Sequence, residues 1–89
     1  MAFSVSFPNY YMEKRYKKDV LAFGRRLKAL RAEAGLTQLD LELQSGISRT
    51  EISKIENGQI NISFMTIVKL ADALDLEIVT FFDNNNSTS

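Results

Sequence analysis

The fold is decided by the stretch Thr37-Gln-Leu-Asp-Leu-Glu-Leu-Gln-Ser-Gly-Ile-Ser-Arg-Thr-Glu-Ile-Ser-Lys-Ile-Glu-Asn57. Within it, Thr37 is followed three residues later by Asp40, and Ser48 is followed three residues later by Glu51. This spacing is typical of a capping box, in which a hydroxyl side chain and an acidic side chain accept each other's backbone N–H groups at the start of a helix. The stretch therefore predicts two helices in quick succession.

Only a turn separates these two helices. Residues 44 to 47, Gln-Ser-Gly-Ile, leave room for a loop of about three or four residues. Gly46 supplies the positive φ that lets the chain reverse without a clash of a Cβ atom. Two short helices joined this tightly, with a glycine in the turn, form a helix-turn-helix.

The second helix of this unit has two different faces. At 100° per residue, Ile52 and Ile55 fall on one side, flanked by Glu51 and Glu56. The opposite arc holds only side chains that form hydrogen bonds: Arg49, Thr50, Ser53, Lys54 and Asn57. Arginine and lysine can donate to the acceptor edge of guanine, and threonine can bond a base or contact the methyl of thymine. Such a face suits the major groove of DNA, although an isolated amphipathic helix more often presents a solvated face.

The segment resembles the helix-turn-helix of the phage repressor and Cro family, often called the Xre family. The resemblance extends from about Phe23 to Phe82 and includes three signatures, Arg31-Ala-Glu-Ala-Gly-Leu-Thr-Gln38, Ile47-Ser-Arg-Thr-Glu-Ile-Ser-Lys-Ile-Glu-Asn-Gly58 and Leu70-Ala-Asp-Ala-Leu74. It implies an all-α, compact five-helix repressor-like DNA-binding domain with the helix-turn-helix inside it. An extra helix or arm at the amino terminus is compatible with this fold.

The expected site lies on the second helix and its surroundings. The side chains expected to contact base edges are Arg49, Thr50, Ser53 and Lys54. Thr37 and Gln38 are expected to hold a phosphate, because unpaired N–H groups and the helix dipole attract anions at the start of a helix. The loop after the second helix lies along the DNA backbone in the family, which implies phosphate contacts for Asn57, Gln59 and Asn61.

Three further features follow from the resemblance. The family's arginine at position 31 reaches the glutamate at position 56, so Arg31 and Glu56 are expected to form a structural ion pair. Glu42 stands where the family usually has alanine, and its carboxylate needs a donor if it is not to be costly there. Leu39 and Leu43 stand where the family commonly has polar residues, and they form an apolar ridge that either the aromatic amino-terminal segment or a partner protein is expected to cover.

Composition limits the remaining possibilities. The 89 residues make one domain, and the absence of Cys and His excludes disulfides, zinc fingers and most catalytic arrangements of a nucleophile and a base. No apolar run reaches the length of a membrane span, so the protein is expected to be cytoplasmic and without membrane attachment. No cofactor is expected. The net charge is zero, but residues 1–35 carry eight Lys or Arg against three Asp or Glu, while residues 36–89 carry three against eight. A nucleic-acid partner needs a basic face rather than a basic average.

The chain is expected to divide into three parts. Residues 1–18 form an extension in which Phe3, Phe7 and three tyrosines are interleaved with basic residues; they suggest either a nucleic-acid arm or an element packed on the domain or on a second subunit. Residues 19–83 form the helix-turn-helix domain, and residues 84–89 a disordered tail.

Three more helices are expected in the domain. The first spans residues 19–34, with an apolar stripe of Val20, Phe23, Leu27, Leu30 and Ala34. The second begins after Ser63 and buries Phe64, Ile67, Val68, Leu70, Ala71 and Leu74. The third is short, spans residues 76–82, and places Ile78 and either Phe81 or Phe82 in the core.

These observations predict sequence-specific binding of double-stranded DNA by a homodimeric transcriptional regulator, a repressor, acting on a pseudo-palindromic operator. The alternative is a protein-binding module, such as an antitoxin-like or anti-repressor partner, which the zero net charge, Glu42 and the apolar ridge favour. An enzyme is poorly supported, because the chain has no His, Cys or glycine-rich phosphate loop.

Overall fold

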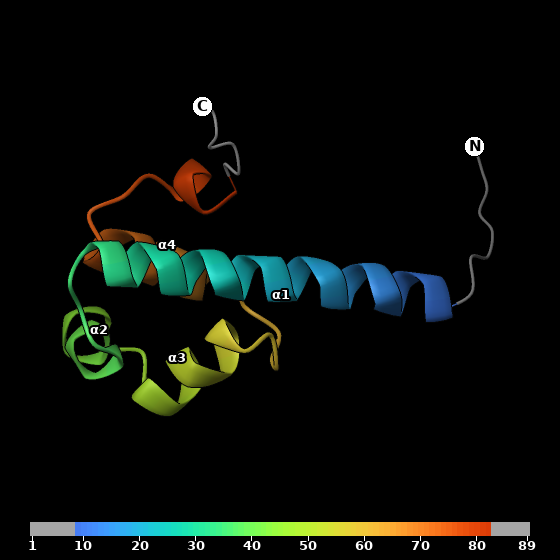
Figure 1. Ribbon diagram of the computed structural model, residues 1–89, viewed down its shortest axis with the longest axis horizontal. Helices are drawn as coiled ribbons and strands as arrows, with labels where there is room; N and C mark the ends of the chain where they lie inside the picture. Colours follow the sequence, from blue (N-terminus) through green and yellow to red (C-terminus); the bar gives the residue numbers. More distant parts are fainter. Residues whose placement is uncertain (1–8, 83–89) are drawn as a thin grey trace.

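The computed structural model describes residues 9–82, in which the secondary structure consists of helices joined by turns and loops, without strands (Figure 1). The four α-helices are α1 (Asn9–Glu33), α2 (Gln38–Ser45), α3 (Arg49–Glu56) and α4 (Phe64–Ala73), and a 3₁₀ helix, η1 (Ile78–Phe82), follows them. The all-α prediction is confirmed. The expected short last helix is a 3₁₀ turn, and the possible extra helix at the amino terminus is instead an extension of α1.

The long helix α1 organises the other elements around one of its halves. Helices α2 and α3 lie on one side of its carboxyl-terminal half, α4 passes behind it, and η1 lies on the side opposite α3 (Figure 1). The amino-terminal half of α1 projects beyond this cluster. From Asn9 to Asp19 every residue of α1 is exposed, and burial begins at Val20. The boundary predicted between residues 18 and 19 therefore falls inside a continuous helix.

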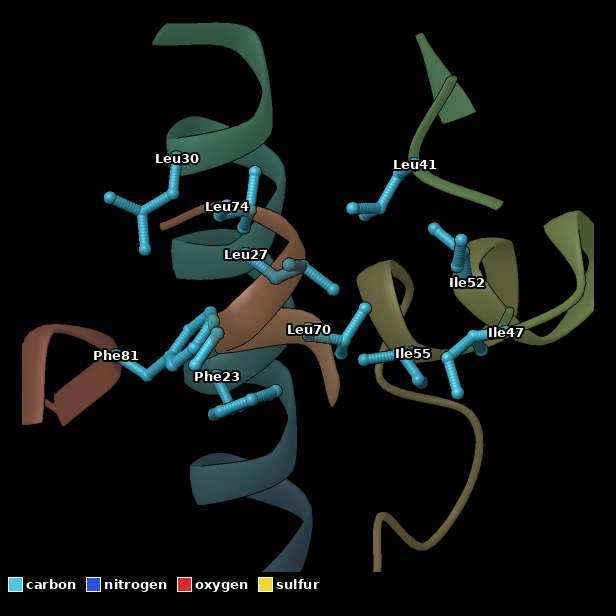
Figure 2. Close-up of a cluster of buried hydrophobic side chains, with 11 residues drawn as sticks. Phe23, Leu27, Leu30, Leu41, Ile47, Ile52, Ile55, Leu70, Leu74 and Phe81 are labelled. Carbon is cyan, nitrogen blue, oxygen red and sulfur yellow. The ribbon is translucent and has the colours of Figure 1, made fainter. Parts of the chain in front are cut away.

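The core is built from apolar side chains of every element (Figure 2). Five of these side chains are completely buried: Leu27, Leu41, Ile52, Ile55 and Leu70. Phe23 of α1 lies 5.2 Å from Phe81 of η1, measured between ring centroids, and this contact attaches the end of the chain to the first helix. Phe81 is the buried member of the last aromatic pair, with 3% of its surface exposed, whereas Phe82 is 59% exposed.

Gly24 allows a close contact between helices α1 and α3. A Cβ atom placed on Gly24 would lie 2.2 Å from the carbonyl oxygen of Ile55 and 2.8 Å from that of Glu56. Because no side chain fits between them, the backbones of α1 and α3 approach each other directly. Glycine adds nothing to the apolar pattern of a helix, so the sequence did not indicate this contact.

Three core predictions are wrong. Ala34 is exposed, because α1 ends at Glu33 and the chain turns at Gly35, which has a φ of 75°. Phe64 and Val68 are also exposed, although both lie on the apolar stripe of α4. The physical reason is that α4 contacts α2 and η1 through a narrower strip than the sequence suggested, formed chiefly by Thr66, Leu70, Ala71 and Leu74.

Candidate nucleic-acid interface

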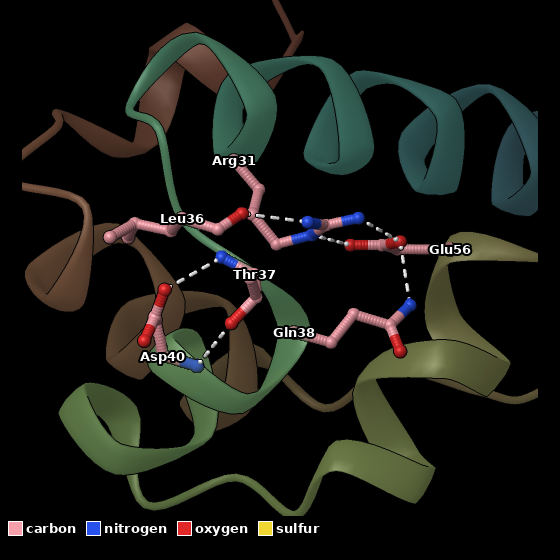
Figure 3. Close-up of polar contacts among 6 residues, drawn as sticks. All are labelled: Arg31, Leu36, Thr37, Gln38, Asp40 and Glu56. Carbon is pink, nitrogen blue, oxygen red and sulfur yellow. Dashed lines mark hydrogen bonds and ion pairs between the residues drawn. The ribbon is translucent and has the colours of Figure 1, made fainter.

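The first capping box is complete. The Thr37 Oγ1 atom accepts a hydrogen bond from the Asp40 backbone N–H at 3.0 Å, and Asp40 Oδ2 accepts one from the Thr37 N–H at 2.9 Å (Figure 3). These bonds lower the pKa of the Asp40 carboxyl, chiefly because the backbone N–H of Thr37 stabilises its charged form. At the other end of α2, Gly46 takes a φ of 80° and its N–H donates to the Glu42 carbonyl. Helix α2 is thus defined at both ends by local bonds.

The start of α3 differs from its prediction. Ser48 Oγ accepts from the Glu51 N–H at 3.1 Å, but the described part of the chain lacks the reciprocal bond to the Glu51 carboxylate, so only half of the second capping box is present. The carboxylate of Glu42 supplies another acceptor, since its Oε1 lies 3.0 Å from the backbone nitrogen of Arg49. A negative group at the amino end of a helix is favourable, because free N–H groups and the helix dipole meet there. Glu42 therefore joins α2 to the first residue of α3.

Helix α3 has one buried and one exposed face. Ile52 and Ile55 are completely buried against α1, α2 and α4. The predicted base contacts lie on the opposite face, where Arg49, Thr50 and Lys54 are exposed and Ser53 is half-buried. Asn57 at the end of the helix, and Gln59 and Asn61 in the following loop, are also exposed. The predicted base contacts of α3 and the predicted phosphate contacts of its loop are thus accessible or partly accessible to solvent, and their roles stay predictions.

An ion pair joins α1 to the carboxyl end of α3 (Figure 3). Arg31 Nε lies 2.6 Å from Glu56 Oε2, and Arg31 Nη2 donates to Glu56 Oε1 at 3.0 Å. Arg31 Nη1 also donates to the Leu36 carbonyl at 2.8 Å. The two side chains are 13% and 3% exposed, and the hydrogen bond to Glu56 raises the pKa of Arg31 above its ordinary value. Arg31 and Glu56 hold α3 in position and do not face the exposed surface.

Gln38 belongs to the same cluster. Its Nε2 donates to Glu56 Oε1 at 3.0 Å, which adds a third donor to the buried carboxylate (Figure 3). The sequence suggested only a phosphate contact for Gln38, because a bond between its side chain and Glu56 depends on how α2 and α3 cross. Helical geometry leaves the backbone N–H groups of Gln38 and Leu39 without intrahelical acceptors. The predicted phosphate site at Thr37 and Gln38 therefore has backbone donors, while the Gln38 side chain is held by Glu56.

The apolar ridge of α2 is uncovered in residues 9–82. Leu39 is 46% exposed and Leu43 is 75% exposed. The amino-terminal end of α1, with Tyr10, Tyr11 and Tyr16, points away from α2 (Figure 1). The expectation that the aromatic segment covers the ridge is wrong for the described tyrosines, because α1 continues as a straight helix instead of folding back. Phe3 and Phe7 lie outside the described residues.

A capped helix anchored by isoleucines, with a row of Arg, Thr, Ser and Lys side chains facing outward after a glycine turn, defines a helix-turn-helix protein of the DNA-binding type. The helix-turn-helix family HTH_3 matches residues 27–81, and the chain belongs to this family. The resemblance to the Xre type, predicted from the sequence, is confirmed. Within residues 9–82, no helix is both long and apolar enough to cross a membrane.

Two of the proteins similar to this chain are named as repressors. The transcriptional repressor RghR of Bacillus subtilis is 46% identical over 56 residues, which cover 62% of this chain and 42% of RghR. The immunity repressor of Bacillus phage phi105 is 34% identical over 58 residues, 65% of this chain and 40% of that protein. The chain thus spans less than half the length of these two relatives. Both of these relatives are named as repressors and not as enzymes.

One solved structure is matched over nearly its whole length. The restriction-modification controller protein C.AhdI from Aeromonas hydrophila is 43% identical, with a TM-score of 0.72. The match covers 73% of this chain and 98% of C.AhdI. The whole fold of that protein is therefore contained in this chain.

Proposed function

We propose that this protein represses transcription by binding a specific double-stranded DNA operator as a symmetric homodimer in the cytoplasm. The observation that carries the proposal is the outward row on α3, where Arg49, Thr50 and Lys54 are exposed while Ile52 and Ile55 are buried. Exposed Arg, Lys and Thr side chains on a fixed helix have the donors and the methyl group that distinguish base pairs in the major groove. The names of RghR and of the phi105 immunity repressor support the repressor role.

Each part of the surface has a separate role in this proposal. Arg49, Thr50, Ser53 and Lys54 contact base edges. The amino end of α2, at Thr37 and Gln38, and the loop residues Asn57, Gln59 and Asn61 contact phosphates on the two sides of the groove. Occupation of a promoter by the protein then prevents transcription.

The homodimer follows from the size of the reading element. Helix α3 has eight residues, and a helix of this length contacts only a few base pairs. Two copies related by a twofold axis read two half-sites about one DNA turn apart, which gives a pseudo-palindromic operator and a useful specificity.

Selection of bound duplexes from a random pool, together with the mass of the protein in solution, tests this proposal. We expect a palindromic consensus and a dimer. Arg49→Ala should then weaken binding to the selected duplex by roughly 1 to 3 kcal/mol per half-site, mainly through one base pair of each half-site. Lys69→Ala, which removes an exposed cation from α4, is the matched control and should have little effect. An equal loss on selected and scrambled duplexes would show that Arg49 contacts phosphate instead of a base.

A second candidate function is supported by the uncovered ridge of α2. Leu39 and Leu43 expose apolar surface beside the helix-turn-helix, as a protein-binding module of the antitoxin-like or anti-repressor kind would. A monomer that shows no salt-dependent binding to any duplex would favour this function over repression. Leu43→Gln should leave DNA binding intact if the ridge serves a protein partner.

A further inference from the structure

We propose that one flank of α1 is an additional phosphate-binding surface, which contacts the backbone of the same duplex that α3 reads. This surface, called here the α1 stripe, consists of Lys14, Lys17, Lys18, Arg25 and Lys28. The inference rests on the proposed function, because its partner is the DNA bound by α3. It adds a binding element outside the helix-turn-helix.

The stripe is formed by the register of α1. At 100° per residue the five cations fall within an arc of about 100°, and at 1.5 Å per residue they extend over about 21 Å of the helix. All five are exposed. The three acidic residues of α1, Glu13, Asp19 and Glu33, fall outside this arc. The arc therefore carries five positive charges without a negative one.

The stripe lies on a rigid support. Helix α1 continues without interruption from its exposed half into the half that is buried from Val20 onward. Within the exposed half, Arg15 and Asp19 approach to 3.7 Å, and the Lys14 ammonium lies 5.4 Å from the centre of the Tyr10 ring. Both are contacts between residues one helical turn apart, which support a helix modestly. The spacing of the cations is thus set by the helix before any ligand binds, which reduces the entropic cost of binding.

The stripe is continuous with the proposed DNA-binding face. Lys17 lines a groove on α1 together with Glu13, which lies outside the arc of the stripe. The other wall of the groove is the loop from Gly58 to Asn61, which contains two of the predicted phosphate contacts. The loop runs directly against α1, since a Cβ atom on Gly58 would lie 3.0 Å from the Leu21 Cα. At the other end of the stripe, Lys28 follows Gly24 by one helical turn, and Gly24 faces α3. A backbone strand that passes the loop would continue along the stripe.

Charge complementarity favours the DNA backbone as the occupant. The chain has no net charge, and its basic excess lies in residues 1–35, so the stripe provides the positive surface that the acidic second half lacks. DNA carries about one negative charge per 1.7 Å of its axis, which suits a row of cations about 21 Å long. The family match begins at residue 27, so four of the five cations precede it. The stripe is therefore an addition to the part of the chain that the family shares.

The salt dependence of DNA binding tests the stripe. The double variant Lys14→Gln/Lys17→Gln should make the slope of log K against log salt shallower by about 1.8, because each phosphate contact contributes about 0.9. Affinity at about 0.1 M salt should fall roughly 10- to 100-fold, equally for the selected and the scrambled duplex. Arg15→Gln/Lys69→Gln changes the net charge by the same amount outside the stripe and should leave the slope unchanged. Circular dichroism checks that both variants remain helical.

The outcomes separate the stripe from the function on which it depends. Equal slopes for the wild type and both double variants, with the sequence preference retained, would overturn the stripe and leave the proposed repressor intact. A change in the ratio between selected and scrambled duplexes would also overturn it, because the stripe would then be reading bases. Absence of salt-dependent binding by the wild type would overturn the proposed function itself.

Discussion

The ion pair between Arg31 and Glu56 gives the sharpest prediction about stability. Replacing Arg31 with methionine retains an aliphatic chain at this position but removes the guanidinium group. Two of the three donors to the Glu56 carboxylate are then lost. The Glu56 side chain is only 3% exposed, so water cannot replace the lost bonds. Of the three hydrogen bonds to the Glu56 carboxylate, only the one from Gln38 Nε2 remains. The variant therefore leaves a buried charge without its counterion.

The magnitude follows from this burial. Breaking a buried ion pair by removal of one partner costs about 3 to 5 kcal/mol. Domains of this size commonly have a free energy of unfolding of about 5 to 15 kcal/mol, so Arg31→Met should remove a large part of the total. Glu56→Met should cost less than Arg31→Met, because the Arg31 side chain is 13% exposed and keeps its bond to the Leu36 carbonyl.

A double-mutant cycle in urea measures the coupling. The cycle uses Arg31→Met, Glu56→Met and the double variant at neutral pH, and the double variant should be more stable than Arg31→Met alone, because it leaves no unpaired carboxylate. Arg31→Lys is the matched control: it keeps the charge but loses the two-pronged geometry, and it should fall between wild type and Arg31→Met. Additive losses, or losses below about 1 kcal/mol for both single variants, would refute the assignment of a buried, coupled pair.

Three further predictions concern other contacts. Gly24→Ala should lower the free energy of unfolding in urea by about 1 to 3 kcal/mol, even though alanine is the better helix former, because its Cβ would meet the Ile55 carbonyl; an unchanged or higher stability would contradict the close helix approach. Glu42→Ala should cost about 0.5 to 2 kcal/mol in thermal unfolding, while Glu42→Gln should be nearly neutral because it keeps an acceptor for α3; equal losses would assign the effect to charge alone. Because folding lowers the pKa of Asp40, its contribution to stability is present above about pH 4, the pKa of an aspartate in an unfolded chain, and is lost as the pH falls through the pKa of the folded state. Asp40→Asn should therefore make the melting temperature fall less steeply on acidification. An unaltered pH profile would count against the bond to Thr37.

Local chemistry explains why the two short helices and the turn between them could be predicted. The caps at Thr37 and Ser48 and the left-handed turn at Gly46 depend on residues close in sequence, so the sequence indicates them, although the reciprocal bond of Glu51 that it also predicted does not form. The buried isoleucines of α3 follow from the period of the helix. The contact between Arg31 and Glu56 spans 25 positions, and the family resemblance rather than periodicity indicated it.

Other features depend on how the helices cross. The partner of Glu42 is a backbone N–H of the next helix, and that of Gln38 is a side chain of α3, so neither could be identified from one helix alone. Phe64 lies on the apolar stripe of α4 but outside the strip that its neighbours cover. The exposed half of α1 could not be predicted for a similar reason. The helix continues toward the amino terminus beyond the core against which its other half packs.

For the proposed binding of a specific operator, the direct contact at Gly24 has a consequence for which duplexes are preferred. The carbonyl groups of Ile55 and Glu56, at the end of α3, lie directly against the backbone of α1 at Gly24. This close packing restricts rotation and tilting of α3 relative to α1. An imperfect match between protein and duplex must then be accommodated by bending or twisting of the nucleic acid. Operators should accordingly be ranked partly by the flexibility of base steps that no side chain touches, with pyrimidine–purine steps favoured where the duplex has to yield.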